Sequence, residues 1–195
     1  MRFFAVILFT VCCYLGLIAS PREYYQSDMQ HLTQENGLAN NTIYSIQQDK
    51  NGFLWLGTDV GISRYDGIHF HNYELIDIEP QAVQRICEMK QDQLLWLKLG
   101  RNHRIACFDK TNGEYIPLEC DSSDYLTYIY DLCIADSVLY ALTPRGIEHI
   151  DYRRTGQSIH VTPELTVAYR YSLKKIVSDD RFLYALDQAG NVLIW

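Results

Sequence analysis

Two histidines lie two positions apart in a segment whose composition suits a β-strand. His69 and His71 would point to the same face of a strand, where two imidazoles can share a metal ion. Two ligands without a third make a weak site, and an outer strand with exposed histidines is the simpler interpretation. We therefore expect no metal at this position.

A short acidic segment offers a second possibility. Residues 49–52 read Asp-Lys-Asn-Gly, which resembles the opening of a calcium-binding loop. The further ligands of such a loop and its closing glutamate are missing from the residues that follow. Asp, Asn and Gly also tolerate the left-handed backbone geometry of tight turns, so the segment predicts a hairpin turn.

One loop contains three side chains suited to binding. Arg101, His103 and Arg104 lie in a loop that is longer than its counterparts elsewhere in the chain. Insertions in a regular scaffold often carry binding residues, although ordinary variation in loop length explains the same sequence. The sequence shows no Ser/His/Asp or Cys/His arrangement and no phosphate-binding loop, so it predicts neither catalysis nor a bound cofactor in this chain.

The elements that would position these residues repeat along the chain. An aromatic anchor inside an apolar triplet recurs at spacings of 41, 44 and 44 residues, at Trp55, Trp96, Tyr140 and Tyr184. Six residues after each anchor comes a residue that tolerates positive φ, and these residues are Gly61, Asn102, Gly146 and Gly190. Repeats of this length, built from β-type segments and turns, predict a β-propeller. The equivalent positions of the anchors predict packing between blades rather than sugar-binding platforms.

We expect an all-β fold of about four blades, each a four-stranded antiparallel sheet, with the fourth blade incomplete. The repeats would span about residues 36–80, 81–121, 122–165 and 166–195. Residues 21–35 predict an extra strand that would close the ring by pairing with the last blade. Because a partial ring leaves sheet faces exposed, we expect the chain to be the N-terminal part of a longer protein, or a truncated gene product.

The first 20 residues predict export. Arg2 precedes an apolar stretch from residue 3 to residue 18, and the small residues Ala19 and Ser20 follow, which is the order found in a secretory signal. An uncleaved membrane anchor is the alternative, although 16 residues are short for a bilayer core of about 30 Å. The net charge of −7, without a basic cluster, argues against nucleic acid as a partner.

Export would place the remaining cysteines in an oxidising compartment, where disulfides are possible. These cysteines are Cys87, Cys107, Cys120 and Cys133. Two of them, Cys87 and Cys133, fall in apolar segments that open a repeat, where a free cysteine packs as a small hydrophobic residue. Buried thiols are the favoured interpretation, and disulfides remain open.

The first repeat resembles a known family. The resemblance is carried by residues 31–49, His-Leu-Thr-Gln-Glu-Asn-Gly-Leu-Ala-Asn-Asn-Thr-Ile-Tyr-Ser-Ile-Gln-Gln-Asp, by residues 52–58, Gly-Phe-Leu-Trp-Leu-Gly-Thr, and by residues 61–67, Gly-Ile-Ser-Arg-Tyr-Asp-Gly. They resemble the two-component regulator propeller family, and more closely the start of the periplasmic sensor of a Bacteroides-type hybrid two-component system. The resemblance weakens in the later repeats, where Gly57-Thr58 is replaced by Lys98-Leu99, Leu142-Thr143 and Leu186-Asp187.

The resemblance implies a sensor whose propellers lie outside the cytoplasmic membrane, with a histidine kinase, a receiver and a DNA-binding domain inside. This chain would be exported and periplasmic, tethered to the membrane through its parent, and would form the first blades of a scaffold that receives or transmits a glycan signal. Its partners would be the remaining blades of the parent, an oligosaccharide and, in the parent, a second copy in a dimer. The alternative is a fragment of a secreted β-propeller enzyme that acts on carbohydrates.

Overall fold

A computed structural model describes residues 29–75, 82–100, 103–121, 128–168, 173–179 and 182–195. The chain divides into two compact units, residues 1–31 and residues 32–195, and every strand that is described belongs to the second unit. The predicted signal segment, residues 1–20, lies outside the described residues. Within the described ranges, no helix is long and apolar enough to cross a membrane.

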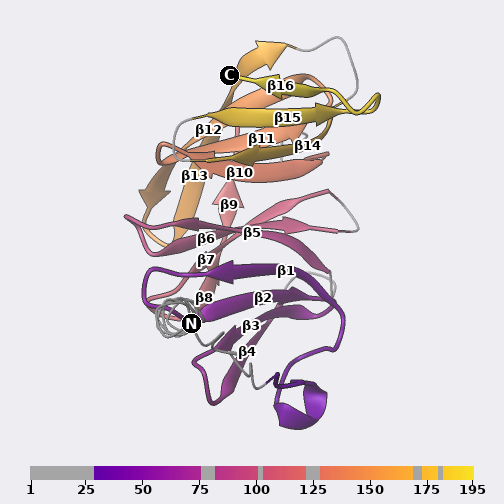
Figure 1. Cartoon of the computed structure of the whole chain (residues 1–195). Helices are drawn as coiled ribbons and strands as arrows, with labels where there is room; N and C mark the ends of the chain where they lie inside the picture. The colour runs from indigo at the N-terminus through magenta and orange to yellow at the C-terminus, as the bar shows by residue number, and fades with distance from the viewer. Residues whose placement is uncertain (1–28, 76–81, 101–102, 122–127, 169–172, 180–181) are drawn as a thin grey trace, which may run out of the picture. The chain divides into compact units, whose positions relative to one another are not determined.

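The second unit consists of small antiparallel sheets, here called blades 1 to 4, that follow one another in chain order (Figure 1). This arrangement confirms the predicted β-propeller. The strands of blade 1 are β1 (Ile43–Gln48), β2 (Leu54–Thr58), β3 (Gly61–Tyr65) and β4 (Phe70–Glu74). Those of blade 2 are β5 (Val83–Met89), β6 (Leu94–Leu99), β7 (Ile105–Asp109) and β8 (Glu114–Ile116). Those of blade 3 are β10 (Asp131–Ala135), β11 (Val138–Thr143), β12 (Gly146–Thr155) and β13 (Ser158–Ala168), and those of blade 4 are β14 (Leu173–Ser178), β15 (Leu183–Asp187) and β16 (Val192–Ile194).

The first strand of each blade contacts the first strand of the next blade. These inner strands are β1, β5, β10 and β14. Each inner strand pairs with the anchor-bearing strand of its own blade, so that Gln47, Cys87, Cys133 and Val177 lie opposite the four aromatic anchors. A register shift near the start of β1, β5 and β14 marks an irregularity in the ladder at the same place in three blades.

Glycine is required where the second hairpin of a blade turns against its outer strand. Gly61 and Gly146 have φ angles of +141° and +138°, which residues with a side chain rarely adopt. A Cβ at Gly61 would lie 2.4 Å from the carbonyl oxygen of Tyr73, and one at Gly146 would lie 2.1 Å from that of Val167. The predicted positive-φ positions therefore also allow the backbone of β4 and β13 to approach closely.

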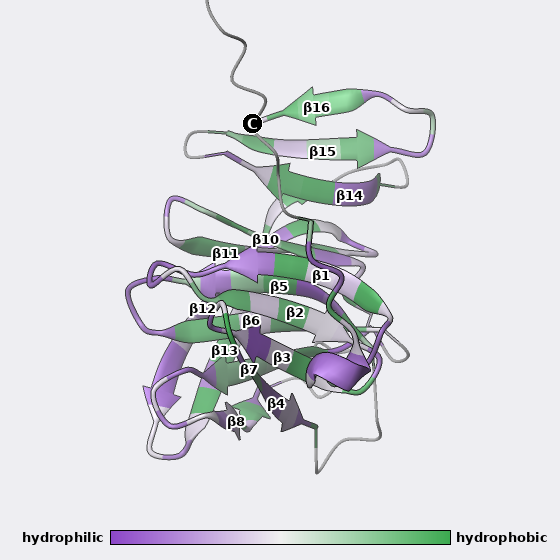
Figure 2. Cartoon of the chain, turned by 60° about the horizontal axis from the view of Figure 1, so that its bottom comes forward, coloured by the Kyte–Doolittle hydropathy of each residue, from purple (hydrophilic) through white to green (hydrophobic). Residues whose placement is uncertain are grey.

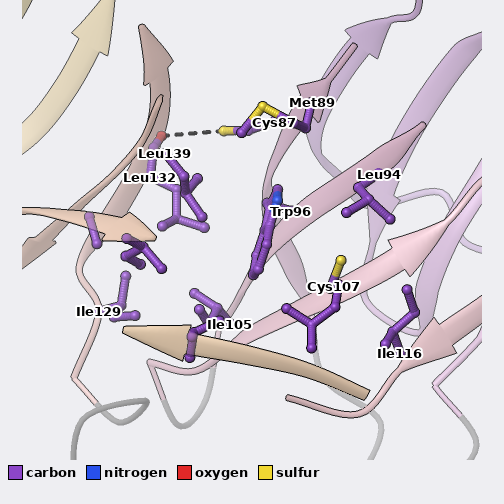
Figure 3. Packing of buried hydrophobic residues seen from close by; sticks show 14 residues of the cluster. Cys87, Met89, Leu94, Trp96, Ile105, Cys107, Ile116, Ile129, Leu132 and Leu139 are labelled. Carbon is purple, nitrogen blue, oxygen red and sulfur yellow. Dashed lines mark hydrogen bonds between the residues drawn. The ribbon is translucent and has the colours of Figure 1, made fainter. Parts of the chain in front are cut away.

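The core consists of apolar clusters between neighbouring blades. The cluster between blades 2 and 3 surrounds Trp96, which is fully buried among residues that include Leu132 and Leu139 (Figure 3). The Trp96 ring lies 5.2 Å from that of Tyr152 in blade 3, and the Trp55 ring lies 5.6 Å from that of Phe108 in blade 2. The two tryptophan anchors thus occupy blade interfaces.

The tyrosine anchors lie in less enclosed positions. Tyr140 packs against the cluster between blades 3 and 4, beside Leu183 and Ala185. Tyr184 is half-buried, and its hydroxyl donates a hydrogen bond of 2.7 Å to Asp179 in the turn that precedes β15. Gly190, the last of the predicted turn glycines, has a φ of +91° in the hairpin between β15 and β16.

The strand expected within residues 21–35 stays a prediction, because its partner would belong to the last blade of the ring. Residues 29–33 are not in a strand, residues 21–28 lie outside the described part, and Gln34–Asn36 forms a 3₁₀ helix, η1. Thr33 caps this helix, since its hydroxyl accepts from Glu35 N while the Asn36 side chain accepts from Thr33 N, and Gly37 ends it with φ of +101°. Local capping thus satisfies backbone groups at both ends of this short helix.

Blade 3 differs from the expected four-stranded sheet. Blade 3 has five strands, because β9 (Leu118–Glu119) leaves the second repeat and pairs in parallel with β13. The hairpin of β12 and β13 is long and continues to Ala168, past the predicted end of the third repeat at residue 165. Blade 4 has three described strands, as expected for an incomplete blade.

Candidate functional site

A groove of about 630 Å³ runs along the inner strands. Its walls are residues 45–47 of β1, 85–88 of β5, 133–134 of β10 and 177–178 of β14, together with turn residues 90–91, 136–137 and 179. All four blades contribute, because the inner strands lie next to one another. Most of the lining side chains are polar, so the groove suits a hydrated, polar ligand better than an apolar one.

Arg85 connects three inner strands at the groove. The side chain starts on β5, its Nε donates to the carbonyl oxygen of Leu132 on β10 at 3.2 Å, and Nη2 donates to that of Ile176 on β14 at 3.4 Å. Asp131 lies 3.8 Å from Nε and supplies the opposite charge. Because a guanidinium presents several donors in a fixed plane, one side chain can hold two neighbouring strands at once.

Two further side chains link neighbouring inner strands. Ser45 Oγ on β1 accepts from Ile86 N on β5 at 3.1 Å, and Asp131 Oδ2 on β10 accepts from Ile176 N on β14 at 3.1 Å. Both residues occupy the same ladder position within their blades. These polar groups therefore hold neighbouring blades together by hydrogen bonds. The exposed turn residues of the groove are the groups most accessible to a ligand.

A buried charge cluster lies beneath one end of the groove. Lys110 Nζ lies 2.5 Å from Glu88 Oε1 and 3.4 Å from Asp49 Oδ2, and all three side chains are buried. Asp49 also accepts hydrogen bonds from the backbone N of Asn51 at 2.9 Å and from the indole of Trp55 at 2.9 Å. The acidic segment at residues 49–52 is thus a turn locked by its own aspartate, as the turn interpretation predicts.

Two thiols border the groove but are poor nucleophiles. Burial raises the pKa of Cys87 and Cys133 to about 12, and Cys87 Sγ donates to the carbonyl oxygen of Leu132 at 3.5 Å. A cysteine acts as a nucleophile or a metal ligand in its thiolate form, which these environments disfavour. Cys107 is buried with a pKa raised in the same way, Cys120 is half-buried, and all four are free thiols.

The residues of the long loop do not converge on one site. Arg101 lies outside the described residues. His103 has a φ of +49°, and its ring stands edge-on to Tyr130 at 5.6 Å, at the start of blade 3. Arg104 borders a different hollow of about 460 Å³ between β7, β8 and residues 117–120, which His103 does not line. The two described candidates therefore face different surroundings.

Exposed tyrosines near the start of the inner strands were missed by the sequence analysis. Tyr44 lies near the start of β1, Tyr130 directly precedes β10, and both side chains are exposed. The Tyr44 hydroxyl donates to Asp59 at 2.8 Å, and this hydrogen bond raises the pKa of Tyr44. Superposing the repeats on their anchors does not match the two tyrosines, because Tyr44 precedes Trp55 by 11 residues and Tyr130 precedes Tyr140 by 10 (44 to 55, 130 to 140).

His69 and His71 remain separate from other metal-binding groups in the described part of the chain. The nearest carboxylate recorded for them is Asp66, whose Oδ2 lies 4.0 Å from His69 Nδ1. Asp66 is engaged in its own turn, where its Oδ1 accepts from the backbone N of Ile68 at 2.8 Å. Both histidines are exposed, but only His71 lies on β4, and His69 directly precedes that strand.

Comparisons with known proteins find similarity to propeller domains of two-component systems. Residues 37–60 match the model of the family described as two component regulator propeller. A comparison with curated proteins found no match. Among solved structures, the chain is similar to the extracellular domain of BT3049 from B. thetaiotaomicron, described as a hybrid two component system, with 22% identity and a TM-score of 0.61 over 85% of this chain and 24% of that one.

Two further structures share the fold. The extracellular domain of BT4673, also from B. thetaiotaomicron, is 19% identical with a TM-score of 0.59 over 84% of this chain and 22% of that one. The computationally designed Ika4 protein is 15% identical with a TM-score of 0.56, over 86% of this chain and 98% of that one. The chain spans about a quarter of the length of the two Bacteroides domains. The match to the two component regulator propeller model thus covers residues 37–60, in a chain with a β-propeller fold.

Proposed function

We propose that the chain is part of an extracytoplasmic sensor, in which its blades help to receive or transmit a chemical signal. The observation that carries this proposal is the polar groove along four inner strands of a propeller that bears a two component regulator repeat. The similar solved domains are described as extracellular, which supports export of this chain as well. The parent would be a protein kinase, and this segment would bind and transmit rather than catalyse.

The ligand that we propose is an oligosaccharide. Hydroxyl and amide side chains such as Ser137, Gln47 and Gln91 line the groove and offer both donors and acceptors, which sugar hydroxyl groups require. Two charged groups in the walls are already paired, Arg85 with Asp131 and Glu88 with Lys110. The hydroxyl and amide side chains of the groove remain available to a ligand rich in hydroxyl groups.

We also propose that further blades of a longer parent cover the outer sheet faces. Strands β14 to β16 are largely hydrophobic (Figure 2), and Val192 and Ile194 are each 61% exposed on the side away from blade 3. On the other side of the unit, Ile46 of β1 is 63% exposed, whereas its counterparts Ile86 and Leu132 are buried. Exposed apolar sheet faces of this kind are typical of a blade that lacks its neighbour.

Calorimetric titration of the chain with a panel of oligosaccharides tests the sensing proposal. We expect saturable binding that is weakened by Gln47→Ala, because Gln47 lines the groove. Gln48→Ala is the matched control, since Gln48 is the next residue on β1 and does not line the groove. Equal effects of the two substitutions would place the ligand elsewhere, and release of reducing sugar would favour the carbohydrate-active enzyme instead.

A further inference from the structure

Three side chains with metal-binding chemistry meet on the long hairpin of blade 3. His149 and Asp151 lie two residues apart on β12 and therefore project from the same face. Glu164 lies directly opposite His149 on β13, so its side chain projects from that face as well. The three residues come from two strands, and Asp151 and Glu164 are 13 positions apart in the sequence (151 to 164). No local sequence motif predicts that these three residues meet.

The distances between their ligand atoms suit a metal ion. His149 Nε2 lies 3.5 Å from Glu164 Oε2 and 3.9 Å from Asp151 Oδ2, and all three ligand atoms lie within 4.8 Å of one another. Both N···O distances exceed the roughly 2.7–3.2 Å of a good hydrogen bond. Ligands at about 2.0–2.2 Å from a tetrahedral zinc ion lie about 3.4 Å apart, so small side-chain movements would complete the geometry.

The histidine is already oriented toward the carboxylates. The Oγ1 atom of Thr166 on β13 lies 3.0 Å from His149 Nδ1. The same oxygen accepts a hydrogen bond of 3.1 Å from the backbone N of His149. This contact occupies Nδ1 and directs Nε2 toward Asp151 and Glu164. A hydrogen bond to the second ring nitrogen is the usual support of a metal-ligating histidine.

The two carboxylates have no other cationic partner in the described ranges, where their recorded ion pairs are both with His149. Their side chains are 71% and 63% exposed, so a metal ion could enter from solvent and keep a position open for water. One imidazole with two carboxylates favours Zn²⁺ over Ca²⁺, because calcium sites are built from oxygen ligands and usually have at least six of them.

We propose that His149 Nε2, Asp151 and Glu164 form a binding site for a divalent ion of the zinc type, outside the groove. The bound ion joins β12 to β13 across the hairpin, with water in its fourth position. The site is independent of the sensing function proposed above. The sequence analysis considered metal binding at His69 and His71 and at residues 49–52, whereas this site uses residues that the hairpin register brings together.

Titration of the untagged, chelator-treated full chain with ZnCl₂, followed by calorimetry, tests the site. We expect one equivalent to bind, and His149→Gln and Glu164→Gln each to weaken binding at least tenfold. Thr166→Val should weaken binding by about tenfold and shift the visible absorption of bound Co²⁺, because the ring loses its support. A role of Thr166 in hairpin stability alone would leave that spectrum unchanged.

His160→Gln is the matched control. His160 also lies on β13, and its Nε2 is 3.7 Å from Asp121. Among the described residues, no second carboxylate, His or Cys completes a group of three metal ligands there. Binding should be unaffected by this substitution. The proposal is overturned if Zn²⁺ fails to bind, if His149→Gln and Glu164→Gln leave the affinity unchanged, or if equimolar Ca²⁺ displaces the ion. Asp151→Asn gives a third test should one of the other variants fold poorly.

Discussion

At the scale of single residues, the close approach at Gly61 makes the sharpest prediction. Gly61→Ala would place a Cβ 2.4 Å from the carbonyl oxygen of Tyr73 at a φ of +141°. The hairpin would have to move away from β4, so we expect the free energy of unfolding to fall by about 1–3 kcal/mol. Urea denaturation of the full chain measures this loss.

Gly52→Ala separates the effect of the contact with β4 from the effect of the positive φ. Gly52 also has a positive φ, of +88°, but a Cβ there would meet nothing within 4 Å. Its smaller loss of stability should report backbone strain alone. An equal loss in the free energy of unfolding of the two alanine variants would show that the close approach of β4 to Gly61 does not contribute to stability.

Asp49 links the first hairpin to the pH dependence of stability. Burial opposes its ionisation, but hydrogen bonds from the Trp55 indole and the Asn51 backbone and the attraction of Lys110 outweigh this, so the pKa of Asp49 is lowered. A carboxyl group with a lowered folded pKa stabilises the protein above its unfolded pKa of about 3.9, and that contribution is lost as the pH falls through the folded pKa.

Asp49→Asn should therefore flatten the acid side of the stability profile. We expect the melting temperature of the unaltered chain to fall more steeply than that of the variant between about pH 5 and pH 2, because only the unaltered residue takes up a proton on acidification. Melting followed by circular dichroism across this range measures both profiles. Parallel curves would show that Asp49 does not contribute to the pH dependence.

At the scale of elements, Arg85 couples blade 4 to the rest of the unit. Arg85→Gln removes the donors to Leu132 and Ile176, and we expect amide exchange in β14 and β15 to accelerate by about tenfold. Lys175→Gln is the control, since Lys175 holds the same ladder position in blade 4 and is exposed. Hydrogen exchange followed by mass spectrometry measures the exchange rates of both variants. Equal rates in the two variants would contradict a coupling of blade 4 through Arg85.

Elements with their own turn chemistry could be predicted from the sequence. The hairpins around Asp49 and Gly61 follow from residues that favour turns, and the repeat of the anchors places each strand. The pairing of β9 with β13 could not be predicted, because two residues of parallel pairing leave no periodic pattern. The same holds for Arg85 and for His149, whose partners are set by the strand register and by contacts between blades.

The residues that precede blade 1 are held by a capped helix and by side-chain hydrogen bonds. The strand predicted within residues 21–35 stays a prediction, and the capped helix η1 lies at the end of that range. Ala39 N donates to Ser63 Oγ at 3.2 Å, and Asn72 donates to the carbonyl oxygen of Gly37 at 2.9 Å. The family-like residues at 37–39 thus cover part of the first sheet.

At the scale of the whole molecule, the exposed face of blade 4 decides how the chain behaves alone. Val177, Tyr184 and Ile194 lie opposite one another on this face, and Val192 lies beside them. The matching residues of blade 2, Cys87 and Trp96, are buried against blade 3. A face with the composition of a blade interface but without a neighbour should associate with another copy, because that removes apolar surface from water.

The prediction is therefore concentration-dependent self-association of the chain, measured by light scattering. Replacing Val192 and Ile194 together with lysine should reduce it strongly, since two charges would lie in the contact. Leu165→Lys is the control, because Leu165 is an exposed apolar residue of β13 outside this face. A chain that stays monomeric at every concentration would contradict the prediction, and loss of association in the Leu165 variant alone would move the contact to blade 3.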